Sequence, residues 1–460
     1  MPDTIDGDGR GAPVHLQSSP SRRSHTPRAL SALTGRWQGF HATPAGMGLS
    51  VATTVVVWAA AAVAWTLQCL HFDRGGPKLG WDLVTCWRAE RVFAHGGQPY
   101  SLAATGDRLF LYPPSALLVL RPLAALSLRE LQVLGLLATA GLMWAAVMIS
   151  AAVLGRRWWG LTAAVVVLAL RWAQPMLAEL SLENVTVICT FGLVVFYLLA
   201  TKGHWVPAGF VIGLTLSVKP LLLVVLLVFV LARKWAALAV ALAVPAVLNA
   251  AAFAVVKDPS EVFSKLPSLL NRSGSGVLLN SAWVDVLRTL GVPDYLTILV
   301  RLATVALVLL AAWWSWQQLD DLAVRIITTS SVLLIGTYLA GTLSENHFML
   351  TLVPLAMTAV VPAAPMRWLS GWIGVLWLMG LTPPGSVLGL SAPANLSAGR
   401  AFGMTLVVLT VVAALGYRRL PQRNAASGSP SGDNTSGPSG DNAPRQETAR
   451  ADALERVLAP

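Results

Sequence analysis

The chain has 460 residues, of which 55% are hydrophobic and only 12% are charged, and its mean hydropathy is +0.63. Soluble domains carry roughly 25% charged residues, so this composition excludes an ordinary soluble protein and predicts an all-α polytopic membrane protein. The charges lie in short clusters between apolar runs of about 20 residues, each long enough to cross a hydrocarbon core of about 30 Å. Because lipid offers the backbone no hydrogen-bond partners, these runs are expected to be helices.

The net charge of +11 does not indicate a nucleic-acid partner. No basic stripe carries the stacking aromatic side chains of such a site, and much of the excess lies in the tails and short connectors, where the positive-inside rule places it. Three cysteines are too few for a disulfide framework or a zinc site. Cys69 and Cys86 flank the first predicted outer loop, and both a disulfide between them and a chance arrangement remain open. Cys189 lies inside an apolar run.

The N-terminal part of the chain predicts a leader, one span and an outer loop. Residues 1–47 are polar and rich in Pro, Ser and Gly, which is typical of a disordered leader, and they contain no cleavable signal peptide. Arginines before the first span, 48–70, keep its N-terminus in the cytoplasm. Residues 71–111 then form an outer loop. The next stretch, 112–126, would make a helix of only about 22 Å and contains Pro122, so it is not expected to cross.

The remaining spans follow from alternating apolar runs and basic connectors. In the run 205–232, Pro220 blocks a continuous helix and Lys219 is costly at membrane depth unless the chain turns there, so two short helices are expected. A second outer loop, 257–292, is expected to carry interfacial helices. The other predicted spans are 130–154, 159–175, 183–201, 235–256, 293–316, 323–343, 347–363, 367–382 and 400–417.

These spans give about twelve crossings on the hydropathy criterion, with both termini cytoplasmic. Residues 418–460 repeat the sequence PSGDN and predict a disordered cytoplasmic tail. The transmembrane domain is therefore expected to cover 48–417, with its polar residues crowded toward the outer face.

Asp82 is the first candidate catalytic residue. It begins an amphipathic segment, 81–97, in the first outer loop, and transfer of a sugar from a phosphate needs a carboxylate to take the proton of the attacking hydroxyl. The neighbouring Trp81 and Trp87 suit the C–H faces of sugars, although their rings also suit the headgroup level. A solvated acid between interfacial tryptophans is the structural alternative. Two further candidates for binding sugar or acceptor in the same outer stretch are Arg88 and Tyr112.

Lys219 is the candidate for binding a phosphate. A lysine at membrane depth marks an anion site by default, and a phosphate matches its compact charge. The alternative is that Lys219 snorkels to the surface from a helix end. Arg171, near the outer end of its span, and Arg272, in the second outer loop, could join the same anion site or act as interfacial anchors.

Two outer junctions supply the remaining candidates. The sequence 179-ELSLEN-184 offers Glu183 and Asn184 as sugar or phosphate ligands, and 344-SENHF-348 offers Glu345 and His347 for sugar hydroxyls or proton transfer. No Walker loop, Rossmann glycine pattern, HExxH or paired CxxC occurs, and no DxD pair marks the outer loops for a metal-bridged diphosphate donor. The expected donor is a monophosphate held by cations, with no metal and no cofactor.

An outer loop with an early aspartate, the sequence YPP and a Lys-Pro break resemble the GT-C glycosyltransferases of actinobacteria, and within them the membrane arabinofuranosyltransferases of cell-wall synthesis. The resemblance extends from about 80 to 365. The stretches that carry it are 213-GLTLSVKPLL-222, 233-RKWAAL-238, 244-VPAVLNAAA-252 with 258-DP-259, and 328-TTSSVLL-334.

The resemblance implies a GT-C fold, a decaprenyl-phosphate-arabinofuranose donor, a cell-wall arabinan acceptor and an inverting, metal-independent transfer. The active site would lie on the outer face of the plasma membrane. By position, Asp82 matches the catalytic aspartate of the family, and Lys219 matches the lysine before its proline.

Two alternatives stay open. The arabinofuranosyltransferase pattern is rich in glutamine and tyrosine where this chain has Glu345, Asn346 and His347. A histidine there is more similar to the polyprenyl-phosphate-mannose-dependent mannosyltransferases that act on phosphatidylinositol mannosides or lipoglycans. Broken helices are also a signature of transporters and lipid flippases, although the hydropathy shows no inverted repeat.

Overall fold

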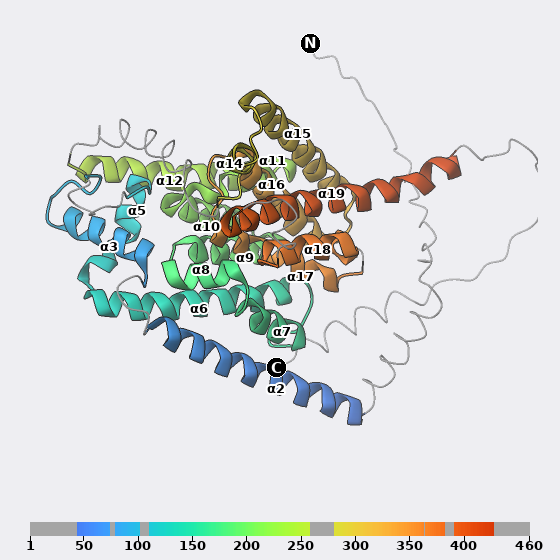
Figure 1. The fold of residues 1–460 in the computed structure, drawn as a ribbon, viewed down its shortest axis with the longest axis horizontal. Coiled ribbons are helices and arrows are strands. Elements are labelled where there is room, and N and C mark those ends of the chain that lie inside the picture. Colours follow the sequence, from blue (N-terminus) through green and yellow to red (C-terminus); the bar gives the residue numbers. More distant parts are fainter. Residues whose placement is uncertain are drawn as a thin grey trace, which may run out of the picture. The chain divides into compact units, whose positions relative to one another are not determined.

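The computed structural model describes residues 44–73, 79–101, 110–257, 280–362, 364–381 and 391–426. All regular structure in these ranges is helical (Figure 1). The chain divides into two compact units, Met1–Val412 and Ala413–Pro460. Of the second unit, the described residues include only the C-terminal end of the last helix, so the packing below is that of the first unit. Most of the predicted leader and tail lies outside the described residues.

Six helices in the described ranges are long and apolar enough to cross a membrane. They are α2 (Pro44–Asp73), α6 (Leu128–Val153), α12 (Trp235–Val255), α15 (Asp294–Gln318), α16 (Leu322–Ala340) and α19 (Ala392–Ala426). A bent pair, α7 (Leu161–Leu170) and α8 (Gln174–Leu182), passes the same test together. The protein is therefore a multi-pass membrane protein, as its composition predicts.

Shorter apolar helices lie between the long ones. They are α9 (Thr186–Thr201), α10 (Trp205–Val218), the pair η3 (Pro220–Val225) and α11 (Leu226–Leu231), the series η4 (Asn346–Leu352), α17 (Val353–Met357) and η5 (Thr358–Val360), and α18 (Leu369–Leu378). The predicted total of about twelve crossings stays a prediction, because length and composition do not decide which of these short helices cross.

The segments between the spans are short helices too. They are α3 (Trp81–Ala94), α5 (Pro114–Val119), η2 (Arg121–Ala125), α14 (Trp283–Thr289) and η6 (Pro365–Arg367). The stretch 112–126 forms only α5 and η2, in agreement with the expectation that it does not cross. In the predicted second outer loop, residues 258–279 lie outside the described residues, and α14 follows them.

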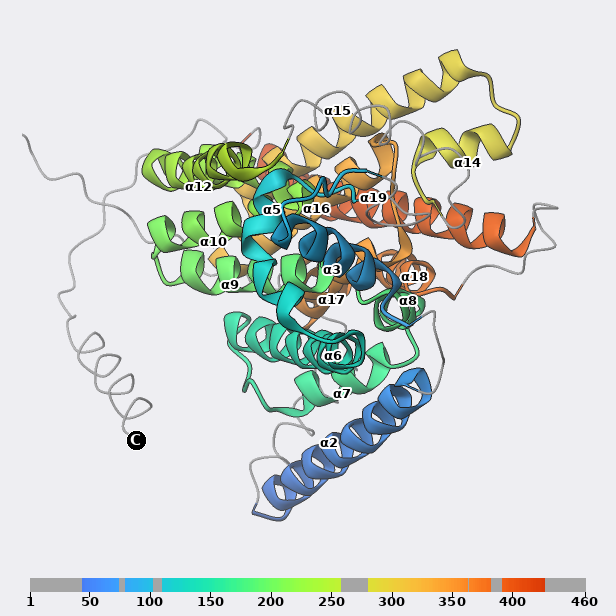
Figure 2. The same ribbon diagram turned by 90° about the vertical axis from the view of Figure 1, so that its left-hand side faces the viewer.

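Helix α2 lies at the edge of the bundle, beside α7 (Figure 1 and Figure 2). Two indole groups fix this pairing. Trp58 Nε1 donates to Trp159 O at 2.7 Å and Trp65 Nε1 donates to Val167 O at 2.8 Å. Most other side chains of α2 are exposed, as expected of a helix that faces lipid on its remaining surface. At the opposite extreme, α16 is the most buried span and packs along α15.

Helices α10 and α12 approach closely because small residues line their contact. A Cβ on Gly209 would overlap the backbone of Ala237, and a Cβ on Gly213 would lie 2.8 Å from Val244 Cβ. Helix α10 then ends at Val218, Lys219 is extended, with φ −148° and ψ 124°, and η3 begins at Pro220. The predicted Lys-Pro break is therefore present.

Two predicted spans have different limits in the structure. The stretch 159–175 does not form one helix, because α7 ends at Leu170 and α8 starts at Gln174 with a bend of 67°. Pro175 lies in the first turn of α8, where its missing N–H is harmless and where it prevents continuation of α7. The last span begins at Ala392 rather than at 400, which places Arg400 inside the helix.

Candidate active site

Helix α3 is held so that Asp82, in its first turn, faces the junction between α8 and α9. Gly80 precedes the helix with φ 68°, a left-handed conformation that glycine adopts without strain. Its N–H donates to Ser181 O at 3.0 Å, and Gln132 Nε2 donates to Leu79 O at 2.8 Å. These two bonds fix the start of α3 against α8 and α6.

Asn184 is the central residue of the site. Its Nδ2 donates to Asp82 Oδ2 at 2.7 Å. Its Oδ1 accepts from the backbone N–H of Thr186 at 3.0 Å and from Thr186 Oγ1 at 2.8 Å. The carboxamide therefore satisfies a backbone donor at the start of α9 and at the same time orients the carboxylate of Asp82.

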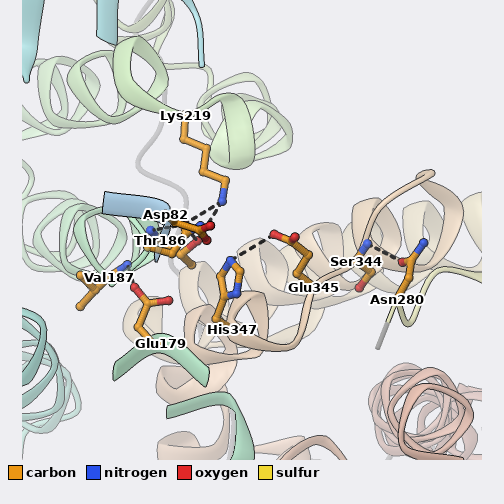
Figure 3. Close-up of polar contacts among 10 residues, drawn as sticks. Asp82, Glu179, Thr186, Val187, Lys219, Asn280, Ser344, Glu345 and His347 are labelled. Atoms are coloured by element: carbon orange, nitrogen blue, oxygen red, sulfur yellow. Dashed lines mark hydrogen bonds and ion pairs between the residues drawn. The ribbon is translucent and has the colours of Figure 1, made fainter. Parts of the chain in front are cut away.

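Lys219 reaches the same carboxamide from the break after α10. Lys219 Nζ donates to Asn184 Oδ1 and to Thr186 Oγ1, both at 3.0 Å, and it lies 4.4 Å from the centroid of the Phe348 ring. Figure 3 shows Lys219 pointing toward Asp82 and Thr186. Near the break, Ser115 Oγ donates to Ser217 O at 2.6 Å, which satisfies a carbonyl near the end of α10 and anchors α5 there.

Glu345 and His347 face this cluster from the junction before η4 (Figure 3). Glu345 Oε2 lies 3.3 Å from His347 Nε2, and the histidine is buried. Burial alone would raise the pKa of Glu345, but the hydrogen bond and charge of His347, together with the charge of Lys219, outweigh it and lower the pKa to about 2. Glu345 is therefore a carboxylate at neutral pH.

Tyr112, in the YPP sequence, is close enough to the same acids for their charges to affect the pKa of its phenol. Burial raises the pKa of its phenol well above the usual value, and the nearby acidic groups, Asp82 and Glu345 among them, raise it further. The phenol is therefore neutral and keeps its proton, so it can donate a hydrogen bond to a sugar hydroxyl.

Glu183, the residue before Asn184, packs its side chain against the start of α3 and against α6. It ends α8 in the left-handed region, with φ 51°, which is strained for a residue with a side chain. Its buried carboxyl group lies against Gly80 and Gly135, so closely that a Cβ on either glycine would collide with it. Burial raises its pKa to about 8. Glu183 is thus a packed, protonated turn residue beside Asn184 and not a ligand that faces the cluster.

The remaining candidates are exposed, form hydrogen bonds elsewhere in the fold, or lie outside the described residues. Trp87 Nε1 donates to Leu126 O at 3.0 Å, which joins α3 to the end of η2, while Trp81 and Arg88 are exposed on α3. Arg171 Nε donates to Ala64 O at 3.2 Å on α2, so Arg171 anchors α2 and does not face Lys219. Arg272 lies outside the described residues. All three cysteines are free, so Cys69 and Cys86 do not pair.

Sequence reasoning missed Glu179 and Thr186. Glu179 is fully buried, and its Oε1 accepts from the backbone N–H of Val187 at 3.1 Å (Figure 3). Glu179 lies in α8, four residues before Glu183, and the paired acids in 179-ELSLEN-184 were the available signal. Thr186 forms an Asn-x-Thr sequence with Asn184, which is typical of a side-chain cap at a helix start.

The arrangement combines a carboxylate and an ammonium on one carboxamide, next to a Glu–His pair. These groups can accept a proton from a hydroxyl and stabilise a departing anion within one site. Among the described residues, no group of three or more His, Cys, Asp or Glu side chains lies where it could hold a metal ion. A multi-pass helical fold with such a site at its helix junctions contains the groups that transfer of a sugar from a lipid-linked phosphate requires.

Comparison with known proteins gives the family. The family model of glycosyltransferase family 87 matches residues 110–340, half of the chain, and the chain belongs to this family. This family is one of glycosyltransferases, and its description names neither a transporter nor a lipid flippase. The match begins after Asp82 and includes Asn184 and Lys219.

Curated relatives extend the comparison. The chain is 35% identical over 176 residues to an alpha-(1→3)-arabinofuranosyltransferase of Mycobacterium tuberculosis, which is 38% of this chain and 40% of that protein. It is 29% identical over 297 residues to the enzyme of that name from Mycolicibacterium smegmatis, which is 60% of this chain and 67% of the relative. The Corynebacterium glutamicum enzyme of that name is 25% identical over 321 residues, 65% of this chain and 72% of the relative. No solved structure matches the chain.

Proposed function

We propose that the protein transfers arabinofuranose from a polyprenyl-phosphate carrier, decaprenyl-phosphate-arabinofuranose, to a cell-wall arabinan. The names of the three relatives support the sugar. The bridge of Asn184 between Asp82 and Lys219 supports the reaction. One end of this bridge is a base for the acceptor hydroxyl, and the other is a cation for the phosphate of the donor.

The proposed reaction is a single displacement at the anomeric carbon. Asp82 takes the proton of the acceptor hydroxyl, whose oxygen forms a bond to the anomeric carbon. The bond from that carbon to the phosphate oxygen breaks on the opposite face, which inverts the configuration, and polyprenyl phosphate leaves with the bonding electron pair. Asn184 donates to the Asp82 carboxylate at 2.7 Å, which fixes its orientation for proton transfer. The reaction needs no metal and no cofactor.

Lys219 supports the departure of the phosphate. Its ammonium lies beside the N-terminus of α9, which begins at Thr186, and a helix N-terminus carries a partial positive charge. The two positive sources act on the same place, where negative charge develops as the phosphate leaves. The active site is proposed to face the outside of the plasma membrane, with both termini in the cytoplasm.

Transfer of mannose from a polyprenyl-phosphate-mannose donor is the second candidate function. The observation that favours it is His347, which is buried, pairs with Glu345 at 3.3 Å and packs beside Phe348, the ring under Lys219. In the arabinose reaction, the Glu345–His347 pair would bind hydroxyls of the furanose. In the mannose reaction, it would bind those of the larger pyranose.

The deciding experiment compares the two donors on the purified protein. Decaprenyl-phosphate-arabinofuranose and polyprenyl-phosphate-mannose are each supplied with an arabinan oligosaccharide or a phosphatidylinositol mannoside, and extension is followed by mass spectrometry. We expect extension of arabinan with the arabinose donor, with inversion at the anomeric carbon seen by NMR. Extension with mannose alone would establish the second function, and extension with neither donor would reject both.

The variant Asp82→Asn tests the base in the same assay. An asparagine oxygen can still accept from Asn184, so the fold is expected to be unchanged, while the base is lost and the rate falls about 10²- to 10⁴-fold. The matched control is Asp73→Asn, which removes a surface ion pair with Arg129 at 2.7 Å. Exposed pairs contribute little, so the control should keep its turnover. Near-normal turnover in Asp82→Asn would contradict the assignment.

A further inference from the structure

Arg400 is a buried cation without a partner in the described part of the chain. It lies in α19, its side chain is 0% exposed, and it is the largest of the fully buried side chains. None of its three side-chain nitrogens, Nε, Nη1 and Nη2, has a hydrogen-bond partner there. A guanidinium is always charged, and a buried charge is strongly unfavourable unless it is paired and hydrogen-bonded. The partner of Arg400 is therefore expected to be a ligand.

The position of Arg400 follows from the packing of α18 on α19. Gly371 lies against Thr410, whereas Gly403 lies against Trp377, so the two helices are antiparallel. Arg400, one turn before Gly403, is thus near the C-terminal end of α18. At that end, Gln174 N donates to Met379 O at 3.0 Å and Gln174 O accepts from Asn346 Nδ2 at 3.1 Å. Arg400 therefore lies at the level of the junction before η4.

Further hydrogen-bond donors on the neighbouring segments are also unused. Ser281 Oγ, Trp283 Nε1 and Ser344 Oγ are buried, and within the described ranges none of them has a hydrogen-bond partner. Ser281 N donates to Ser344 O at 2.8 Å, which joins these two segments. The ring of Trp283 lies 5.6 Å from that of Phe402, two residues after Arg400 on α19. Unpartnered donors on segments that reach α19 beside a buried cation indicate an anionic ligand.

We propose that Arg400 binds the phosphate of a phospholipid. Arg400 lies about 12 Å along α19 from its first residue, at 1.5 Å per residue, inside an apolar span. A free inorganic anion would have to leave water to reach it, whereas the acyl chains of a lipid bring its phosphate to this depth. A guanidinium forms two parallel bonds to a phosphate. The proposal concerns a site separate from the donor phosphate at Lys219 and does not rest on sugar transfer.

The experiment measures lipid binding to the full-length purified protein in detergent. Phosphatidylglycerol, diacylglycerol and inorganic phosphate are titrated separately, with native mass spectrometry to count bound lipid and thermal melting to measure stabilisation. We expect one phosphatidylglycerol to bind, and neither diacylglycerol nor inorganic phosphate to replace it. The variant Arg400→Met should weaken that binding at least roughly 10- to 150-fold, which is the effect of losing one of the two charge-assisted hydrogen bonds. Arg367→Met, at an exposed arginine of the same unit, should bind as the wild type does.

Several outcomes overturn the proposal. They are an absence of bound phosphatidylglycerol on the wild type, equal binding by Arg400→Met, and equal binding of diacylglycerol. Binding of inorganic phosphate without the lipid would overturn the lipid assignment. If Arg400 has no ligand, Arg400→Met only removes an unpaired buried charge. The variant should then melt at a higher temperature than the wild type, even when phosphatidylglycerol is present. If Arg400→Met does not fold, Arg400→Lys takes its place, with binding expected between the two because an ammonium cannot form the parallel pair of bonds.

Discussion

Lys219 uses two of its three N–H donors on Asn184 and Thr186, so one remains for an oxygen of a ligand. Replacement by methionine keeps the apolar stem and removes the charge. Charge-assisted bonds contribute about 1.5–3 kcal/mol, so Lys219→Met is expected to weaken donor binding roughly 10- to 150-fold while acceptor binding changes little. Arginine should rescue it only in part, because its planar fork differs from an ammonium.

The measurement is the affinity of the folded variant for a polyprenyl-phosphate sugar, compared with its affinity for the acceptor. Lys234→Met is the matched control, because Lys234 is exposed and its ammonium lies 5.7 Å from the Trp205 ring. If the donor bound Lys219→Met as tightly as it binds the control, Lys219 would have no part in the donor site.

Glu90 on α3 predicts a pH dependence of stability. Its side chain is fully buried, and burial raises its pKa from an ordinary 4.5 to about 8, although the charge of Arg121 opposes this. Between pH 4.5 and about pH 8, the folded protein holds a proton on Glu90 that the unfolded chain has lost. The contribution of Glu90 to stability is therefore full below about pH 4.5 and decreases as the pH rises to about 8. The variant Glu90→Gln cannot ionise and should lack this part of the decline. Melting curves from pH 5 to 8 test it, and parallel slopes for the two proteins would contradict it.

At the scale of the elements, α6 contains a matched pair of glycines. A Cβ on Gly135 would collide with the Glu183 carboxyl group and lie 2.5 Å from Leu83 Cδ2, whereas a Cβ on Gly141 would meet nothing within 4 Å. Gly135→Ala should therefore lower the melting temperature and reduce transfer, because it pushes α3 and the turn that carries Asn184 away from α6. Gly141→Ala should be neutral or stabilising by up to about 1 kcal/mol. Equal melting temperatures for the two variants would show that Glu183 can move aside.

Local sequence signals predicted where the elements form better than they predicted which residues contact one another. The Lys219-Pro220 break, the short 112–126 stretch and the α3 helix follow from chain chemistry within a few residues, and the structure contains all three. The partner of Arg171 is the carbonyl of Ala64, 107 residues away, and no local pattern specifies such a contact. The predicted last span began at 400, whereas the helix begins at Ala392, so Arg400 lies inside it.

The site residues show the same limit. Asp82 was predicted from its place in the first outer loop, Lys219 from the break in its apolar run, and Asn184, Glu345 and His347 from outer junctions. The structure brings these residues together. Their grouping around one carboxamide depends on how α3, α8 and α10 pack, which a single sequence does not reveal. Glu183 was predicted to be a ligand, but its left-handed backbone turns the side chain into a slot between two glycines.

At the scale of the whole molecule, the predicted orientation in the membrane is testable with two histidines. His95, after α3, and His204, before α10, are both exposed, and the predicted topology places them on opposite faces. In cells, a cysteine at His95→Cys should react with a membrane-impermeant maleimide. A cysteine at His204→Cys should react only after permeabilisation. The wild type controls for Cys69, which is partly exposed. The reverse pattern would invert the topology.

The shared carboxamide of Asn184 also affects how the energetics of the site can be measured. Asp82 and Lys219 are 137 residues apart in the sequence, yet each makes a hydrogen bond to a different atom of the same side chain. Residues in one hydrogen-bond network show coupling energies of about 0.5–3 kcal/mol. Substitution of either residue therefore perturbs the other through Asn184, and the two effects cannot be added as independent contributions. A double-mutant cycle between them measures the site as one thermodynamic unit.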